Sequence, residues 1–260
     1  MPNDVSETYA SAYSADRSLY GKLRRRASKL MHRKPAQLSG LERPLLTFSF
    51  DDAPLTAATT GADILEAHGF KATYYISAGL MGQDSHFGPY ADAAHIKALN
   101  DRGHEIACHT LLHIDCGRAS ASEIALSTDE NQKLIQSLDI KSSDTFAYPY
   151  GDVSPQAKKV LKTRYTASRA LHHGLITTGT DLNQTPAVGI EGDNGKTLAL
   201  DWMHRAINAP QSWLVLYTHD VRENPSPWGC TPDTLRELAV TAERLGFEVV
   251  TYTQGAHRAS

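Results

Sequence analysis

The stretch Thr47-Phe48-Ser49-Phe50-Asp51-Asp52 is the part of the sequence from which the fold and the site are best inferred. The apolar run 45–50 is typical of a buried strand, and two carboxylates follow where that strand should end. Because neighbouring carboxylates repel, placing both at one strand end costs free energy unless a cation such as a metal ion is close. One carboxylate would then bind the metal, and the other would stay free as a base. The alternative is a helix cap or a turn before Ala53-Pro54.

Two histidines four residues apart extend this interpretation. His109 and His113 would share one face of a helical turn. With Asp52 they supply one oxygen and two nitrogen ligands, a donor set that suits zinc and leaves a position open for water. The sequence therefore predicts a divalent metal held by Asp52, His109 and His113, with zinc favoured over cobalt or manganese. Cys108, beside His109, is expected to point into the core, because side chains alternate along a strand.

Two more segments place polar groups where a strand should end. The segment Tyr148-Pro149-Tyr150-Gly151 is typical of a turn whose backbone N–H can point into a site. The buried-strand pattern 214–218 ends at His219. A long exposed loop over 77–90 is a further candidate for substrate contact. All of this chemistry falls at the carboxyl ends of strands, as it does in barrel active sites.

The order of expected elements indicates an α/β barrel. From Pro44 onward, strands and helices alternate, which predicts βα units around a parallel sheet of seven or eight strands. A chain of 260 residues fits one such barrel. The net charge of −3 carries no signature of polyanion binding, so no nucleic-acid partner is expected. The three cysteines are an odd and sparse set, which argues against a disulfide framework and suits a reducing compartment.

The amino-terminal part differs in composition from the rest. Residues 17–34 combine apolar residues at helical spacing with eight lysines and arginines. We expect a basic amphipathic helix within an N-terminal extension, residues 1–43. It would either lie on an anionic membrane surface or pack on the barrel with its basic face in solvent. The chain has no apolar run of 18 residues and no signal-peptide core, so we expect a cytoplasmic protein, peripheral to the inner membrane if this helix binds lipid.

Taken in order, the motifs resemble those of the NodB-homology polysaccharide deacetylases, carbohydrate esterase family 4. Phe50-Asp51-Asp52 is similar to the first motif, and His109-Thr110-Leu111-Leu112-His113 is similar to the second. Pro149-Tyr150-Gly151 is similar to the third and Leu216-Tyr217-Thr218-His219 to the fifth. The resemblance spans roughly residues 44–253. It implies a distorted (β/α)7 barrel, which we expect over residues 44–260.

The resemblance also implies an activity, the metal-dependent removal of acetyl groups from N-acetylhexosamine units of a glycan. The three predicted metal ligands keep that role. Asp51 would be the base that takes a proton from water, and His219 the acid that protonates the leaving amine. The backbone N–H of Tyr150 would stabilise the oxyanion, and one such donor contributes about 3 kcal/mol. The products would be acetate and a free amino sugar.

Two positions depart from the family pattern. Ala53 stands where the family usually has glycine, and Ala147 stands where an arginine usually pairs with the base. Without a local cation the base would keep a higher pKa. We expect Arg169, at the end of the next strand, to replace the missing arginine.

The family's fourth motif pairs an aspartate with the catalytic histidine, and here it is hard to place. Asp201-Trp202 has its letters but lies inside an expected helix, 196–208. Asp181, in a polar loop, is our predicted partner for His219. The predicted substrate contacts are Pro149, Tyr150, Arg169 and Asp181.

The first hypothesis is a cytoplasmic de-N-acetylase acting on an oligosaccharide or polysaccharide precursor. If the basic helix binds membrane, a lipid-linked glycan of an exported polysaccharide is the natural substrate, and the holdfast polysaccharide deacetylases are the most similar subgroup. A second hypothesis is an amide or imide hydrolase on a small molecule, which the changed third motif allows. A third is a non-catalytic scaffold that binds glycan or membrane. Metal content separates the third from the other two.

Overall fold

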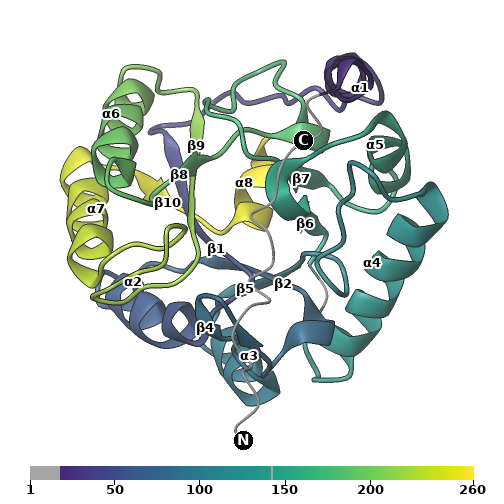
Figure 1. Ribbon diagram of the computed structural model, residues 1–260. Coiled ribbons are helices and arrows are strands. Elements are labelled where there is room, and N and C mark those ends of the chain that lie inside the picture. The colour runs from purple at the N-terminus through teal and green to yellow at the C-terminus, as the bar shows by residue number, and fades with distance from the viewer. Residues whose placement is uncertain (1–17, 142) are drawn as a thin grey trace, which may run out of the picture.

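A curved parallel sheet surrounded by helices forms the body of the computed structural model, which describes residues 18–141 and 143–260. The order of its strands is β7-β6-β5-β2-β1-β9-β8, and β10 pairs with the start of β1. Figure 1 shows the sheet from one end, with the helices outside it. The strands of this sheet are β1 (Leu45–Asp51), β2 (Thr73–Ile76), β5 (Glu105–Cys108), β6 (Thr145–Ala147), β7 (Ala167–Arg169), β8 (Val188–Gly189), β9 (Trp213–Thr218) and β10 (Glu248–Val249).

The remaining elements decorate this sheet. A two-stranded hairpin, β3 (Asp84–Ser85) with β4 (Gly88–Pro89), lies in the loop after β2. The helices are α1 (Leu19–Leu30), α2 (Ala62–Glu66), α3 (Ala93–Asp101), α4 (Ala121–Gln136), α5 (Pro155–Leu161), α6 (Gly195–Ile207), α7 (Pro232–Leu245) and α8 (Tyr252–Arg258). The sheet curls without closing between β7 and β8, so the predicted distorted (β/α)7 barrel is confirmed.

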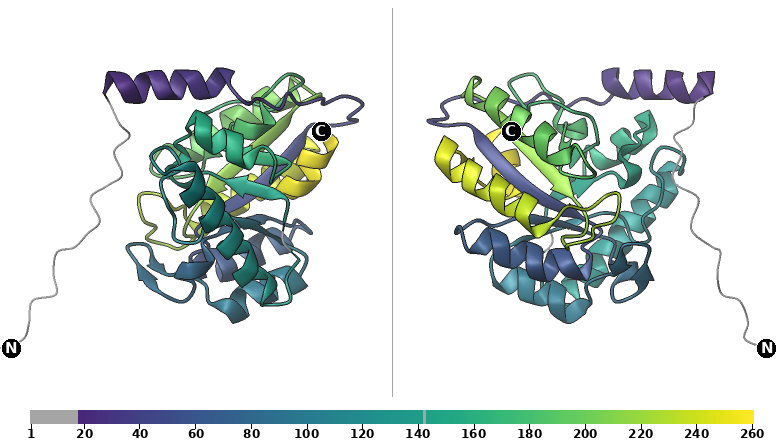
Figure 2. Two further views of the ribbon diagram at one scale, coloured as in Figure 1. Left: turned by 90° about the vertical axis from the view of Figure 1, so that its right-hand side faces the viewer. Right: turned by 60° about the vertical axis from the view of Figure 1, so that its left-hand side comes forward.

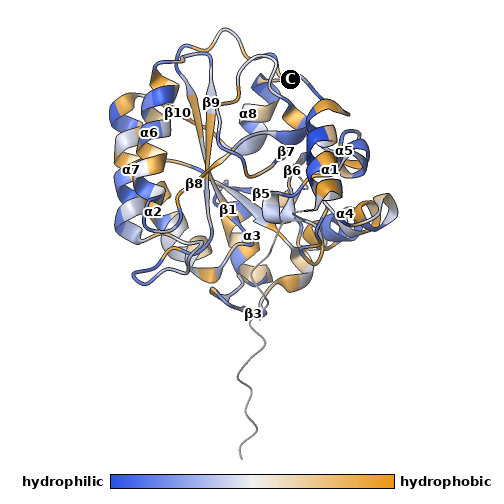
Figure 3. Ribbon diagram, turned by 45° about the horizontal axis from the view of Figure 1, so that its top comes forward, coloured by the Kyte–Doolittle hydropathy of each residue, from blue (hydrophilic) through white to orange (hydrophobic). Residues whose placement is uncertain are grey.

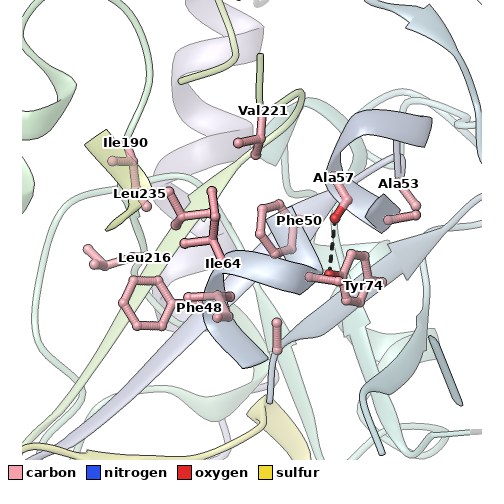
Figure 4. Close-up of a cluster of buried hydrophobic side chains, with 14 of the residues drawn as sticks. Phe48, Phe50, Ala53, Ala57, Ile64, Tyr74, Ile190, Leu216, Val221 and Leu235 are labelled. Carbon is pink, nitrogen blue, oxygen red and sulfur yellow. Dashed lines mark hydrogen bonds between the residues drawn. The ribbon is translucent and has the colours of Figure 1, made fainter. Parts of the chain in front are cut away.

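The central strand β1 is buried on both faces, as parallel strands between helices and a barrel interior must be. Its alternate residues Leu46, Phe48 and Phe50 pack outward with residues of α2 and α7. Figure 4 shows Phe48 and Phe50 beside Ile64 and Leu235 in this layer. Burying each such aromatic side chain contributes about 1.5–3 kcal/mol. The intervening residues, including Asp51, therefore face the interior of the barrel.

Helix α8 covers the amino-terminal end of the sheet. The backbone N–H of Tyr252 donates to the Thr73 hydroxyl at 2.8 Å, and that of Thr253 donates to the Glu105 carboxylate at 2.8 Å. Thr73 and Glu105 are the first residues of β2 and β5. The strand expected over 247–252 is wrong in its second half, because a capping box at Thr251 starts a helix there. With this end covered, only the carboxyl ends of the strands remain for chemistry.

Local capping signals in the sequence place several helix ends. The predicted cap of α4 is confirmed: Ser120 accepts from the Glu123 N–H, and the Glu123 carboxylate accepts from the Ser120 N–H at 2.7 Å. Helix α7 starts with Pro232 and ends at Gly246, whose φ of 74° is the left-handed conformation that glycine adopts without strain.

The N-terminal extension is described only from residue 18. Its first 17 residues, including the start of the predicted basic segment 17–34, lie outside the described residues. Helix α1 follows, and it stands outside the barrel in both views of Figure 2. Within the described part of the chain, none of the helices has the length and apolar character needed to span a bilayer.

Candidate active site

The loops that carry the predicted motifs all leave the carboxyl ends of strands, and they share an unusual backbone. In the described residues, seven residues other than glycine have positive φ, and five of these lie in the three loops after β1, β5 and β6. Such conformations cost free energy for residues with a Cβ atom and mark functional sites more often than ordinary turns. The five are Asp52 (φ 62°), Ala53 (46°), Thr110 (64°), His113 (53°) and Tyr150 (59°).

Asp52, His109 and His113 come together as a cluster that could hold a metal ion. One ligand atom from each lies within 4.8 Å of the others. The Asp52 Oδ1 atom is 3.9 Å from His109 Nε2 and 3.6 Å from His113 Nε2. Ligands about 2.0–2.1 Å from a tetrahedral zinc ion lie roughly 3.3 Å from one another, so small adjustments would complete the site.

The surroundings of these three residues fit a cation. Asp52 Oδ1 is buried and has no hydrogen-bond partner, which is costly unless an ion satisfies it. The His109 Nδ1–H donates to the Ala147 carbonyl at 2.8 Å, so the lone pair of Nε2 faces Asp52. Burial, and then the neighbouring His113, lower the pKa of His109 to about 4, so its imidazole is neutral at pH 7. A neutral imidazole with its second nitrogen fixed is the form that binds metals.

The histidines reach this arrangement by a different route from the predicted helical turn, which is wrong. Residues 109–113 form an irregular loop in which Thr110 and His113 are left-handed. The two imidazole rings still meet, with centroids 4.9 Å apart. The prediction that Cys108 faces the core is confirmed, since its thiol accepts from the Asn131 amide at 3.2 Å in a buried cluster.

Asp51 is buried and paired with a buried arginine. The Arg169 Nη2 atom donates to Asp51 Oδ1 at 2.6 Å, and the guanidinium lies over the rings of Tyr75 and Tyr217 at 4.9 and 5.2 Å. Burial raises the pKa of Asp51, but the positive charge of Arg169 outweighs burial and holds this pKa below its usual 3.8. Asp51 is therefore an ionised acceptor at neutral pH.

The pairing of β6 with β7 explains how Arg169 takes this position. Ala147, where the family usually has arginine, is the direct register partner of Arg169 on the adjacent strand. The two residues thus stand side by side at the same edge of the sheet. The cation has moved over by one strand and still reaches the carboxylate at the end of β1.

His219 follows β9 and lies beside a carboxylate that the sequence analysis missed. Its Nδ1 atom is 3.2 Å from the Trp228 carbonyl oxygen and 3.7 Å from Glu191 Oε2. The other Glu191 oxygen accepts from the Tyr217 hydroxyl at 3.0 Å. Burial alone lowers the pKa of His219, but Glu191 and then Asp51 and Asp52 outweigh it and raise this pKa to about 9. His219 is therefore protonated at neutral pH.

Asp181, the predicted partner of His219, is placed elsewhere, and this prediction is wrong. Its carboxylate pairs with Lys158 and accepts from the Lys34 N–H at 2.8 Å, because its loop returns to the N-terminal extension. Asp201 lies on α6 and pairs with Arg205 at 2.7 Å. Glu191 follows the short strand β8, so a carboxylate after an expected strand was the signal that could have found it.

The third motif forms a tight turn at the end of β6. Residues Pro149–Gly151 make one turn of 3-10 helix, in which Pro149 is buried and Tyr150 has φ 59°. The Tyr150 ring is 41% exposed, and its centroid is 4.4 Å from that of His113. This turn places the Tyr150 backbone and side chain next to the metal ligands.

Aromatic side chains form a rim beside His219. The Phe87 ring, from the predicted substrate-contact loop 77–90, lies 5.9 Å from the His219 ring and 5.3 Å from that of Tyr90. The His86 ring packs against Trp228 at 4.7 Å, and Trp228 is 37% exposed. Trp228 was not predicted from the sequence. Exposed aromatic faces next to polar groups are the surfaces on which sugar rings stack.

Comparison with known proteins agrees with this arrangement. The model of the polysaccharide deacetylase family matches residues 40–166, which include the first three motifs, whereas Arg169, Glu191 and His219 lie beyond that range. The chain belongs to the polysaccharide deacetylase family, whose enzymes are hydrolases acting on N-acetyl groups. No curated protein sequence matches the chain.

Solved structures of this family share the fold. A family 4 acetyl xylan esterase from Clostridium thermocellum, in complex with a cobalt ion, has a TM-score of 0.56 at 23% identity, over 81% of this chain and 89% of that one. The chitin deacetylase of the fungus Colletotrichum lindemuthianum has a TM-score of 0.60 at 15% identity, over 82% and 88%. A mutant of a CE4 family pseudoenzyme with restored enzymatic activity has a TM-score of 0.57 at 14% identity, over 86% and 71%.

Proposed function

We propose that this protein is a metal-dependent de-N-acetylase that acts on N-acetylhexosamine units of an oligosaccharide or polysaccharide and releases acetate. The observation that carries the proposal is the adjacency of two differently equipped carboxylates. Asp51 is held ionised by Arg169, while Asp52 directs a buried and unpartnered oxygen toward two histidines. One base and one three-residue cation site, side by side, are what the hydrolysis of an unactivated amide requires.

Asp52, His109 and His113 would hold the cation, with zinc favoured and cobalt or manganese as alternatives. A divalent cation there would supply a Lewis acid for the acetyl oxygen and increase the acidity of a nucleophilic water. The donor set is neutral imidazole and carboxylate, as zinc sites prefer. The charge on Asp52 is kept for the cation because no other described group hydrogen bonds to its Oδ1 atom.

The proposed reaction adds water to the acetyl carbon and breaks the bond from that carbon to nitrogen. Asp51 accepts the proton of the attacking water, and its low pKa means that it is ionised before substrate arrives. The Tyr150 backbone N–H donates to the oxygen on which negative charge develops, and Pro149 fixes the turn that presents it. His219 gives its proton to the departing nitrogen, with Glu191 holding its imidazolium in place. The products are acetate and the free amine.

The finer assignments follow from other features. We place the substrate against the aromatic rim of Phe87, Tyr90 and Trp228, which suits a glycan. Three buried free cysteines support a reducing location such as the cytoplasm. An exposed apolar side on the basic segment 17–34 supports peripheral contact with the inner membrane, and hence a lipid-linked precursor of an exopolysaccharide.

The test is acetate release from N-acetylglucosamine oligomers by chelated protein, before and after zinc is restored. Release should depend on zinc and should be lost in Asp51→Asn and in His113→Ala. Asp201→Asn and His204→Ala are matched controls, since both side chains lie on α6 away from the site, and they should retain activity. His113→Ala should also lose bound metal, measured by elemental analysis, whereas Asp51→Asn should keep about one ion per chain.

Other outcomes would redirect the proposal. Bound metal without acetate release, together with turnover of a cyclic imide, would favour a hydrolase of small amides or imides. Absence of both metal and release from the purified and zinc-supplemented protein would contradict catalysis and favour a binding scaffold.

A further inference from the structure

Helix α1 turns its apolar side away from the protein. Leu19, Leu23 and Leu30 are 79%, 62% and 79% exposed, and their spacing of four and seven residues places them on one face. The buried residues of this helix are the small Gly21 and Ser28, on the opposite face. A helix that only packs on a barrel would bury its leucines. The alternative in which α1 presents a purely basic face to solvent is therefore wrong.

The contacts of α1 fix this orientation. Arg24 pairs with Asp152 at 2.7 Å, and both side chains are nearly buried. Near the carboxyl end of the helix, the Lys158 ammonium donates to the Ser28 carbonyl at 2.6 Å. The Asn183 amide donates to the His32 carbonyl at 2.9 Å just beyond it. Because both ends are held on the side opposite the leucines, α1 cannot roll over to bury them without breaking these bonds.

The charges on α1 select the surface that the leucines can meet. Lys22, Arg26 and Lys29 are exposed beside the leucines, and the sequence 19–30 contains no acidic residue. Figure 3 shows α1 outside the barrel with hydrophobic and strongly hydrophilic parts along it. A second copy of this helix would bring like charges together, whereas an anionic lipid surface complements the cations and takes up the leucines. Each lysine or arginine near such a surface strengthens attachment by about fivefold.

The position of α1 relates this surface to the candidate site. In Figure 2 the amino-terminal end of α1 extends past the barrel on the side of the yellow-green loop that follows β9. Asp152, the partner of Arg24, directly follows the turn that carries Tyr150. A membrane in contact with the leucines would therefore lie beside the opening of the site and would not cover the α8 end.

We propose that α1 docks the protein on an anionic membrane surface, with Leu19, Leu23 and Leu30 in the interfacial layer and the opening of the site next to the lipid headgroups. For the deacetylase proposed above, on which this clause rests, the substrate would then be a glycan linked to a membrane lipid. Docking itself requires no catalysis, so the two proposals can fail separately.

The test is sedimentation of the full chain with phosphatidylcholine vesicles, with and without phosphatidylglycerol. The wild type should bind only the anionic vesicles, and added salt should weaken binding. Replacing Leu19, Leu23 and Leu30 with serine should abolish binding. Replacing Lys22, Arg26 and Lys29 with glutamine should weaken it by on the order of 100-fold, from about fivefold per charge.

A matched control replaces Leu126 and Leu134, which are exposed on α4, with serine and should leave vesicle binding unchanged. Both α1 variants should keep the melting temperature of the wild type and its acetate release from soluble oligomers, because they alter only exposed side chains. Loss of activity in every protein with vesicle binding intact would contradict only the deacetylase. Binding that survives the leucine variant, or a wild-type dimer that this variant converts to monomers without any vesicle binding, would overturn membrane docking.

Discussion

Replacement of Arg169 by methionine should destabilise the fold mainly through the carboxylate that it leaves behind. The Arg169 side chain is fully buried and that of Asp51 is 4% exposed, so Asp51 would keep its charge in the interior without a partner. Removing one member of a buried ion pair costs about 3–5 kcal/mol. The Nε and Nη1 atoms of Arg169 have no hydrogen-bond partner, so little else of polar character is lost. At roughly 2–4 °C per kcal/mol, the melting temperature should fall by about 10 °C.

A double-mutant cycle isolates this interaction. Asp51→Asn removes the charge, so the pair Asp51→Asn with Arg169→Met should recover most of the stability lost in Arg169→Met alone. Urea unfolding of the metal-free proteins, followed by circular dichroism, measures each free energy. If Arg169→Met lies within about 1 kcal/mol of the wild type, or if the double variant is no more stable than the single one, the buried-pair argument is refuted.

The same pair predicts a pH dependence with a definite sign. Arg169 holds the folded-state pKa of Asp51 below 3.8, so the pair contributes fully above about pH 4 and loses its contribution as the pH falls further. In Arg169→Met, burial without the cation should raise the pKa of Asp51, and protonation should then relieve the unpaired charge. The stability gap between wild type and variant should therefore narrow in acid, and a gap that widens there would contradict this assignment.

Three further predictions concern the loops around the site. Glu191→Gln should lower the pKa of His219 from about 9, and because the protonated imidazole acts as the acid, the alkaline limb of the activity profile should move to lower pH; an unmoved limb would exclude Glu191 as the partner. Gly151→Ala should lower the free energy of unfolding by about 1–3 kcal/mol, since φ is +65° and a Cβ atom would come within 2.5 Å of the next loop, whereas Gly40→Ala, with similar φ but open space, should cost less in the same urea titration. Trp228→Ala should raise KM for N-acetylglucosamine oligomers several-fold with little change in kcat, and a fall in kcat alone would argue against a stacking role.

The parts of the site that were predictable from the sequence are those that depend on one strand at a time. An apolar run that ends in Asp51-Asp52 or in His219 fixes a strand and the edge at which its last side chain lies. The equivalence of Arg169 to the position of Ala147 was inferred, but its geometric reason depends on the register between two strands. Local sequence patterns do not encode that register.

The misses share a dependence on distant contacts. Glu191 follows a strand of two residues, too short to leave a periodic pattern, and only the curvature of the sheet brings it to β9. Helix α1 was predicted with its amphipathic character, but periodicity cannot tell which face meets the barrel. Arg24 and Lys158 decide that through contacts with residues far away in the sequence.

The left-handed residues of the three motif loops put activity and heat resistance in opposition. Each costs about 1–3 kcal/mol relative to a relaxed backbone, and glycine at the same position would relieve that cost. A library selected for thermal stability alone should therefore accumulate glycine at positions such as Asp52 and His113, and in doing so it would discard two of the three candidate metal ligands. A parallel library selected for turnover should keep them. The positions at which the two libraries diverge would outline the active site without any knowledge of its substrate.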